Sequence, residues 1–168
     1  MFAESPDNLL ALAELAIALA GFSAIIVVLR NNDSEKWAAR DVDYFHGMIT
    51  HSAFATLFCL LPALVNLVAQ DTVLTLRVCC ALIGLQIISQ AVVVLRLPSS
   101  GKLAVGAMLL GLLLGFSQLL VFTPWGEDLE LRFYQGAIIW HILQAGMLFV
   151  LLVWIPDSDR DGIDNSGG

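Results

Sequence analysis

Long apolar segments separated by short polar ones dominate the sequence. They run over residues 9–29, 45–69, 74–97, 103–122 and 133–155. An α-helix rises about 1.5 Å per residue, so about 20 apolar residues cross the roughly 30 Å hydrocarbon core of a bilayer. The pattern therefore predicts an all-α polytopic bundle of five transmembrane helices in residues 1–155, with no soluble domain. Residues 156–168 predict an acidic, flexible tail.

Composition supports the same class. Hydrophobic residues make up 58% of the chain and charged residues 14%, with a mean hydropathy of +0.83. A soluble domain carries about 45–50% apolar and about 25% charged residues. The net charge of −7 argues against nucleic acid and against anionic lipid headgroups as partners. Membrane lipids in general are expected partners, because the apolar segments must be surrounded by them. The first basic residue is Arg30, so the first apolar segment lacks the basic start of a signal peptide and predicts a retained helix.

The distribution of basic residues between the loops predicts the orientation. Six fall on one side of the membrane, namely Arg30, Lys36, Arg40, Arg96, Lys102 and Arg160. Two, Arg77 and Arg132, fall on the other. Because cytoplasmic loops are enriched in Lys and Arg, we expect the N-terminus outside and the C-terminus in the cytoplasm. A bacterial inner membrane is the expected location.

Small residues predict how the helices pack. Ala107, Gly111 and Gly115 recur every four residues in the fourth segment, and such stripes let membrane helices approach closely. The pattern leaves open whether the partner helix belongs to the same chain or to a second copy, and we expect a homo-oligomer. Pro62, inside the second segment, cannot donate to the Phe58 carbonyl. It predicts a kink that shapes packing, with a gating hinge as the alternative.

Polar residues inside the apolar segments are the candidate functional residues, because such groups are costly in a bilayer. They are Glu14, His51, Asn66, Gln86, Gln90, Gln118, His141 and Gln144. Counted from the segment ends, they lie at graded depths, and a ladder of this kind suits a path for protons, ions or small polar solutes. The alternative is that they hydrogen-bond between helices, at about 0.6 kcal/mol per pair. The same counting places His141 nearer the outer surface than His51.

Signatures of catalysis and of cofactors are weak. The sequence has no phosphate-binding loop, nucleophile elbow, CxxC or HExxH motif, which favours a non-enzymatic protein without a cofactor and leaves a membrane enzyme or haem protein as a further alternative. His51 and His141 lie on different helices and would have to approach each other to hold haem, but their predicted depths differ.

The acidic tail resembles a calcium loop of the thrombospondin type 3 kind. Asp157, Asp159 and Asp161 alternate, with Gly162 following and Asp164 beyond. Alternating oxygens and a glycine turn suit calcium. The tail lacks an acid at the twelfth position and any neighbouring repeat, which favours a solvated acidic tail over a calcium site.

The first 70 residues resemble a group of small uncharacterised bacterial multi-pass membrane proteins. The resemblance rests on Ala13-Glu14-Leu15-Ala16, on Trp37 and Asp41 in the loop, and on Leu60-Leu61-Pro62. It implies no activity, and it marks Glu14 and Pro62 as positions of interest. The sequence thus predicts a non-enzymatic oligomeric conduit, with a structural, sensing or assembly subunit of a membrane complex as the alternative.

Overall fold

A computed structural model describes residues 6–31, 39–96, 102–123, 126 and 129–154. Its helices are α1 (Pro6–Asn31), α2 (Ala39–Ala69), α3 (Thr72–Leu95), α4 (Lys102–Ser117), the short 3-10 helix η1 (Gln118–Phe122) and α5 (Glu130–Trp154). Five spans are long and apolar enough to cross a membrane, with η1 completing the span that α4 begins. The prediction of an all-α, five-helix multi-pass membrane protein is confirmed.

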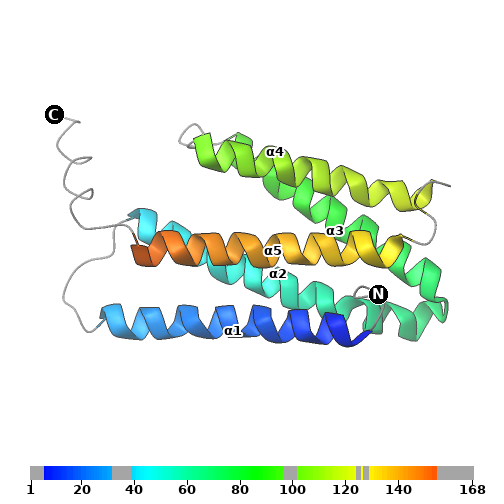
Figure 1. Ribbon diagram of the computed structural model, residues 1–168, viewed down its shortest axis with the longest axis horizontal. Helices are drawn as coiled ribbons and strands as arrows, with labels where there is room; N and C mark the ends of the chain where they lie inside the picture. Colours follow the sequence, from blue (N-terminus) through cyan, green and yellow to red (C-terminus); the bar gives the residue numbers. More distant parts are fainter. Residues whose placement is uncertain (1–5, 32–38, 97–101, 124–125, 127–128, 155–168) are drawn as a thin grey trace.

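The helices form an up-and-down bundle in which α2 and α5 are central (Figure 1). α1 packs against α2 and α5 on one side, and α4 packs against α3 on the other. The N-terminus of α1, the α2–α3 connection, η1 and the start of α5 lie at one end, which we call the α2–α3 end (Figure 1). α3 and α5 therefore run in the same direction, antiparallel to α2.

The α2–α3 connection is as tight as the sequence predicts. Gln70 adopts a left-handed backbone with φ of 51°, and its N–H donates to the Asn66 carbonyl at 3.0 Å. This arrangement caps the C-terminus of a helix. Asp71 then accepts a hydrogen bond from the Leu74 N–H at 3.0 Å and caps the start of α3. Two residues therefore suffice to reverse the chain.

Pro62 has no N–H group, so the Phe58 carbonyl, four residues earlier, lacks its usual donor within α2. The buried Tyr134 hydroxyl on α5 donates a hydrogen bond to the Phe58 carbonyl. Neighbouring helices commonly satisfy a backbone group that proline frees inside a membrane. This contact supports the packing interpretation of Pro62 over the hinge.

The glycine stripe on α4 packs inside the same chain. Gly115 faces Gly84 and Ile88 of α3, and Gly111 faces Ile87 and Trp140. A Cβ on Gly84 would lie 2.9 Å from the Gly115 carbonyl oxygen, so α3 and α4 cross almost backbone to backbone. Ala107 is half-buried in the same stripe. The stripe is therefore occupied by α3 and by Trp140 of α5, and it no longer argues for contact with a second copy.

Candidate functional site

Two histidines meet in the interior between α2 and α5. The Nδ1 atoms of His51 and His141 are 3.0 Å apart, and His141 is fully buried. Two N–H groups cannot point at each other over that distance, so one hydrogen lies between the rings, donated by one nitrogen and accepted by the other. The contact is a single N–H···N hydrogen bond between side chains 90 positions apart in the sequence.

The expectation that these histidines lie at different depths is wrong. Arg77 on α3 pairs with Glu130 at the start of α5, with 3.2 Å between Nη2 and Oε1. Arg77 is five residues into α3, so the α2–α3 hairpin extends about 8 Å beyond the start of α5. Counting depth from the segment ends assumed a common plane, and this offset removes most of the apparent separation.

Aromatic rings close the histidine pair on the side facing the α2–α3 end. Phe54 and Phe58 follow His51 along α2, and their ring centroids lie 5.9 and 6.1 Å from that of His141. Beyond them, the Tyr134 hydroxyl is bonded to the Phe58 carbonyl. The pair is therefore shielded by apolar rings in this direction.

On its other side, His51 lines a pocket of about 330 Å³ between α2, α3 and α4. The polar side chains that share the lining are His46, Thr50, Ser89 and Gln90. His46 and Ser89 are exposed, so the pocket reaches the surface of the bundle. His51 thus connects a polar pocket with the buried ring of His141.

Several buried polar atoms near this level have no hydrogen-bond partner within the described part of the chain. They are Ser52 Oγ, both amide atoms of Gln86, His141 Nε2 and Gln144 Nε2. The paired residues Arg77 and Glu130 mark a common depth on α3 and α5, which run in the same direction. Gln86 and Gln90 lie nine and thirteen residues beyond Arg77, and His141 lies eleven residues beyond Glu130. Both glutamines are therefore within about 3 Å of the depth of His141 along the bundle. We use the name polar layer for the following side chains: His51, Ser52, Gln86, Gln90, His141 and Gln144. Buried polar groups of this kind are normally satisfied by ordered water or by a ligand.

No known protein family, curated protein or solved structure matches this chain. Among the described residues, no three histidine, cysteine or acidic side chains form a metal-binding group. The direct His51–His141 contact also does not suit haem, which would place its iron between the two ligating nitrogens. A proton is what this geometry accommodates between the rings.

The remaining predicted residues lie outside this layer. Glu14 is exposed on α1, and Asn66 is fifteen residues from His51 along α2, about 22 Å away. The Gln118 amide donates to the Phe133 carbonyl at 3.0 Å, eight residues before His141. The tail residues Asp157, Asp159, Asp161 and Asp164 lie outside the described residues.

The sequence interpretation missed three contacts that organise the site. They are the Tyr134–Phe58 hydrogen bond, the Arg77–Glu130 ion pair and the approach of Gly84 to Gly115. Pro62 was a usable signal for the first, since the carbonyl it frees requires a donor from another helix.

Proposed function

We propose that this membrane protein binds and relays protons at the His51–His141 pair. The observation that carries the proposal is the Nδ1–Nδ1 contact of 3.0 Å beside a polar pocket that His51 also lines. Histidine exchanges protons near neutral pH, and ionisable side chains inside membranes commonly mark proton paths. This narrows the conduit hypothesis from ions and solutes in general to protons.

The relay follows from the two nitrogens of each ring. A proton arriving from the pocket binds Nε2 of His51, which releases its Nδ1 hydrogen to Nδ1 of His141. His141 in turn gives up its Nε2 hydrogen to the unpartnered groups of the polar layer, through water that they can hold. The cycle closes when the rings rotate apart and each ring returns to its starting tautomer by exchange with adjacent water, which gives a proton to one ring nitrogen and takes one from the other, with no net proton transfer. Phe54 and Phe58 form the barrier that this path must pass.

Proton flux into proteoliposomes tests the proposal. A potassium gradient with valinomycin supplies the driving potential, and an entrapped pH-sensitive dye reports the flux. We expect wild-type flux to fall to the protein-free background in His51→Gln and His141→Gln. Glu14→Gln is the matched control, because it neutralises an exposed membrane residue on α1 outside the polar layer. Wild-type flux in both histidine variants would refute the relay.

A structural or assembly subunit is the second candidate. It is favoured by Tyr134, Arg77 and Gln118, each of which links two segments of the bundle by a polar contact. In that case the histidine pair also serves only to hold α2 against α5. The two candidates differ in one measurement, since His51→Gln and His141→Gln would then lower stability and leave the proteoliposomes as proton-tight as before.

The proposal includes an orientation of the protein in its membrane and an oligomeric state. Excess Lys and Arg in the loops at the end opposite the α2–α3 end supports an outside N-terminus and a cytoplasmic C-terminus in a bacterial inner membrane. The polar pocket then opens in the cytoplasmic half. Homo-oligomer formation stays a prediction, and cross-linking in native membranes tests it.

A further inference from the structure

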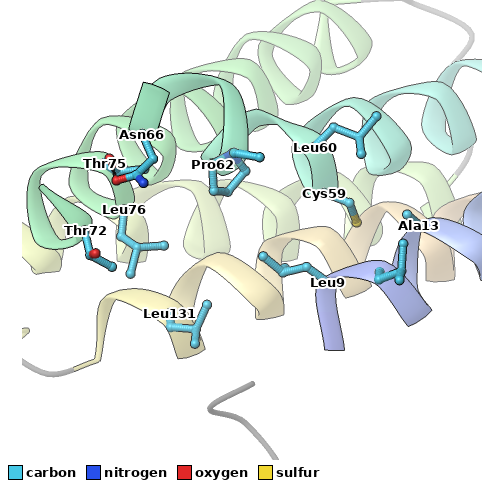
Figure 2. Close-up of a pocket in the computed structure, with 12 residues that line it drawn as sticks. Leu9, Ala13, Cys59, Leu60, Pro62, Asn66, Thr72, Thr75, Leu76 and Leu131 are labelled. Atoms are coloured by element: carbon cyan, nitrogen blue, oxygen red, sulfur yellow. Dashed lines mark hydrogen bonds between the residues drawn. The ribbon is translucent and has the colours of Figure 1, made fainter. Parts of the chain in front are cut away.

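A second pocket lies near the α2–α3 end and is independent of the histidine site. Its volume is about 500 Å³, and side chains from α1, α2, α3 and α5 surround it (Figure 2). All four helices contribute leucines to the lining, namely Leu9, Leu10, Leu60, Leu76 and Leu131. A space of this size falls in the range of ligand pockets, about 300–1,000 Å³.

The polar side chains of this pocket gather near the helix ends. Asn66 lies three residues before the end of α2, and Thr72 is the first residue of α3. The Thr75 hydroxyl donates to the Asn66 amide oxygen at 3.4 Å, and the two side chains lie together in Figure 2. Asn66 therefore presents its amide N–H₂ group, and Thr72 its hydroxyl, as donors at the interfacial end of an apolar pocket.

A ligand of this pocket must be apolar along most of its length and must carry a hydrogen-bond acceptor at one end. An empty apolar space in a bilayer forfeits van der Waals contacts that a hydrocarbon chain would supply, and water gains few hydrogen bonds among leucines. The donors lie close to the membrane–water interface, the depth at which the ester carbonyls of phospholipids sit. A hydrocarbon chain that ends in a hydrogen-bond acceptor satisfies both parts.

We propose that this pocket binds one acyl chain of a membrane phospholipid, with the ester carbonyl accepting hydrogen bonds from Asn66 and Thr72. Pro62 and the small Ala63 are among the α2 residues that line the pocket. The chain lies between α1 and the α2–α3 hairpin and fills the junction of four helices. This lipid is a specific ligand of the fold, in contrast to lipids that cover its outer surface.

Photo-cross-linking tests the assignment. The full chain is reconstituted in phosphatidylethanolamine–phosphatidylglycerol vesicles that contain a phosphatidylglycerol with a diazirine on one acyl chain. After irradiation, mass spectrometry maps the adducts. We expect them to concentrate on residues that line the pocket. Ala63→Phe should reduce this labelling several-fold by filling the pocket, and Asn66→Leu should reduce it by removing the donor.

Ala53→Phe is the matched control, because Ala53 is an exposed alanine on the same helix outside the pocket. It should label like wild type. If Ala63→Phe does not fold, Asn66→Leu decides the question. Equal labelling in wild type, the folded pocket variants and Ala53→Phe would refute the site. So would displacement of the probe by a small amount of ubiquinone but not by excess unlabelled phosphatidylglycerol, since the pocket would then prefer a quinone.

Discussion

Replacing Gly84 by alanine should separate α3 from α4, and the structure gives the size of the effect. A Cβ at Gly84 would lie 2.9 Å from the Gly115 carbonyl oxygen and 2.9 Å from Gln118 Cβ. The first is backbone, and Gln118 is held by its bond to the Phe133 carbonyl at 3.0 Å. Neither neighbour can move without shifting a helix, and overpacking of this kind costs about 1–3 kcal/mol.

Gly111 provides the matched control for this change. A Cβ there would lie 3.5 Å from the Trp140 ring, an ordinary contact, on the same helix–helix surface. Both substitutions gain the same intrinsic helix propensity, up to about 1 kcal/mol in water. That gain cancels in the comparison, so Gly84→Ala should be less stable than Gly111→Ala by about 1–3 kcal/mol.

Reversible unfolding in mixed micelles, followed by far-ultraviolet circular dichroism against the detergent fraction, measures the difference. Equal stability of the two variants would refute the inferred backbone contact. Cross-linking of the two variants provides a second check. Because the glycines pack within one chain, neither substitution should change the oligomeric state. A change of oligomeric state in Gly111→Ala alone would place this stripe at a contact between copies.

Three further changes test other contacts. Tyr134→Phe should lower the free energy of unfolding by about 1 kcal/mol in the same assay. The loss should be smaller in a Pro62→Ala background, because the restored N–H at position 62 can donate to the Phe58 carbonyl. An equal loss in both backgrounds would contradict the interpretation of the proline. Arg77→Met should cost about 1–2 kcal/mol, because Glu130 has a side chain only 9% exposed and would lose its cation; no loss at low salt would refute this. Phe54→Ala should raise proton flux in proteoliposomes by opening the aromatic barrier, and unchanged flux in a folded variant would refute that role.

The helices of this fold were predictable from hydropathy, and their ends were not. The predicted second segment begins at residue 45, whereas α2 begins at Ala39. Hydropathy detects the part of a helix inside the hydrocarbon, and a helix continues into the interface wherever its residues allow it. The fourth segment was predicted as one helix, but its last turn is the 3-10 helix η1. Apolar content alone does not distinguish these two forms.

The residues of the candidate site were predictable from the sequence, but the contacts between them were not. Both histidines were identified because ionisable groups are rare in membrane spans. Their contact depends on the offset between α5 and the α2–α3 hairpin, which the Arg77–Glu130 pair records. The helix that packs against the α4 stripe could not be predicted either, because Gly84 is an isolated glycine in the sequence of α3. Its role is evident only from its contact with Gly115. Such offsets and pairings arise from tertiary packing.

His141→Leu separates a functional polar layer from a structural one. His141 is fully buried, its Nε2 has no partner among the described residues, and its Nδ1 meets His51. Moving a polar side chain from water into an interior where its hydrogen bonds are only partly replaced costs about 1–3 kcal/mol, whereas a hydrogen bond between membrane helices contributes about 0.6 kcal/mol on average. Leucine removes the larger cost along with the smaller gain, and the His51 ring freed by the change still faces its polar pocket.

We therefore expect His141→Leu to unfold at the same detergent fraction as wild type or a higher one, and to lose proton flux. Stability that is given up at a functional site is regained in this way when the site is replaced. A structural role predicts the reverse, a loss of stability with α2 released from α5. A destabilised His141→Leu whose flux matches wild type would assign the pair to packing, and the unpartnered atoms around it would then require another explanation.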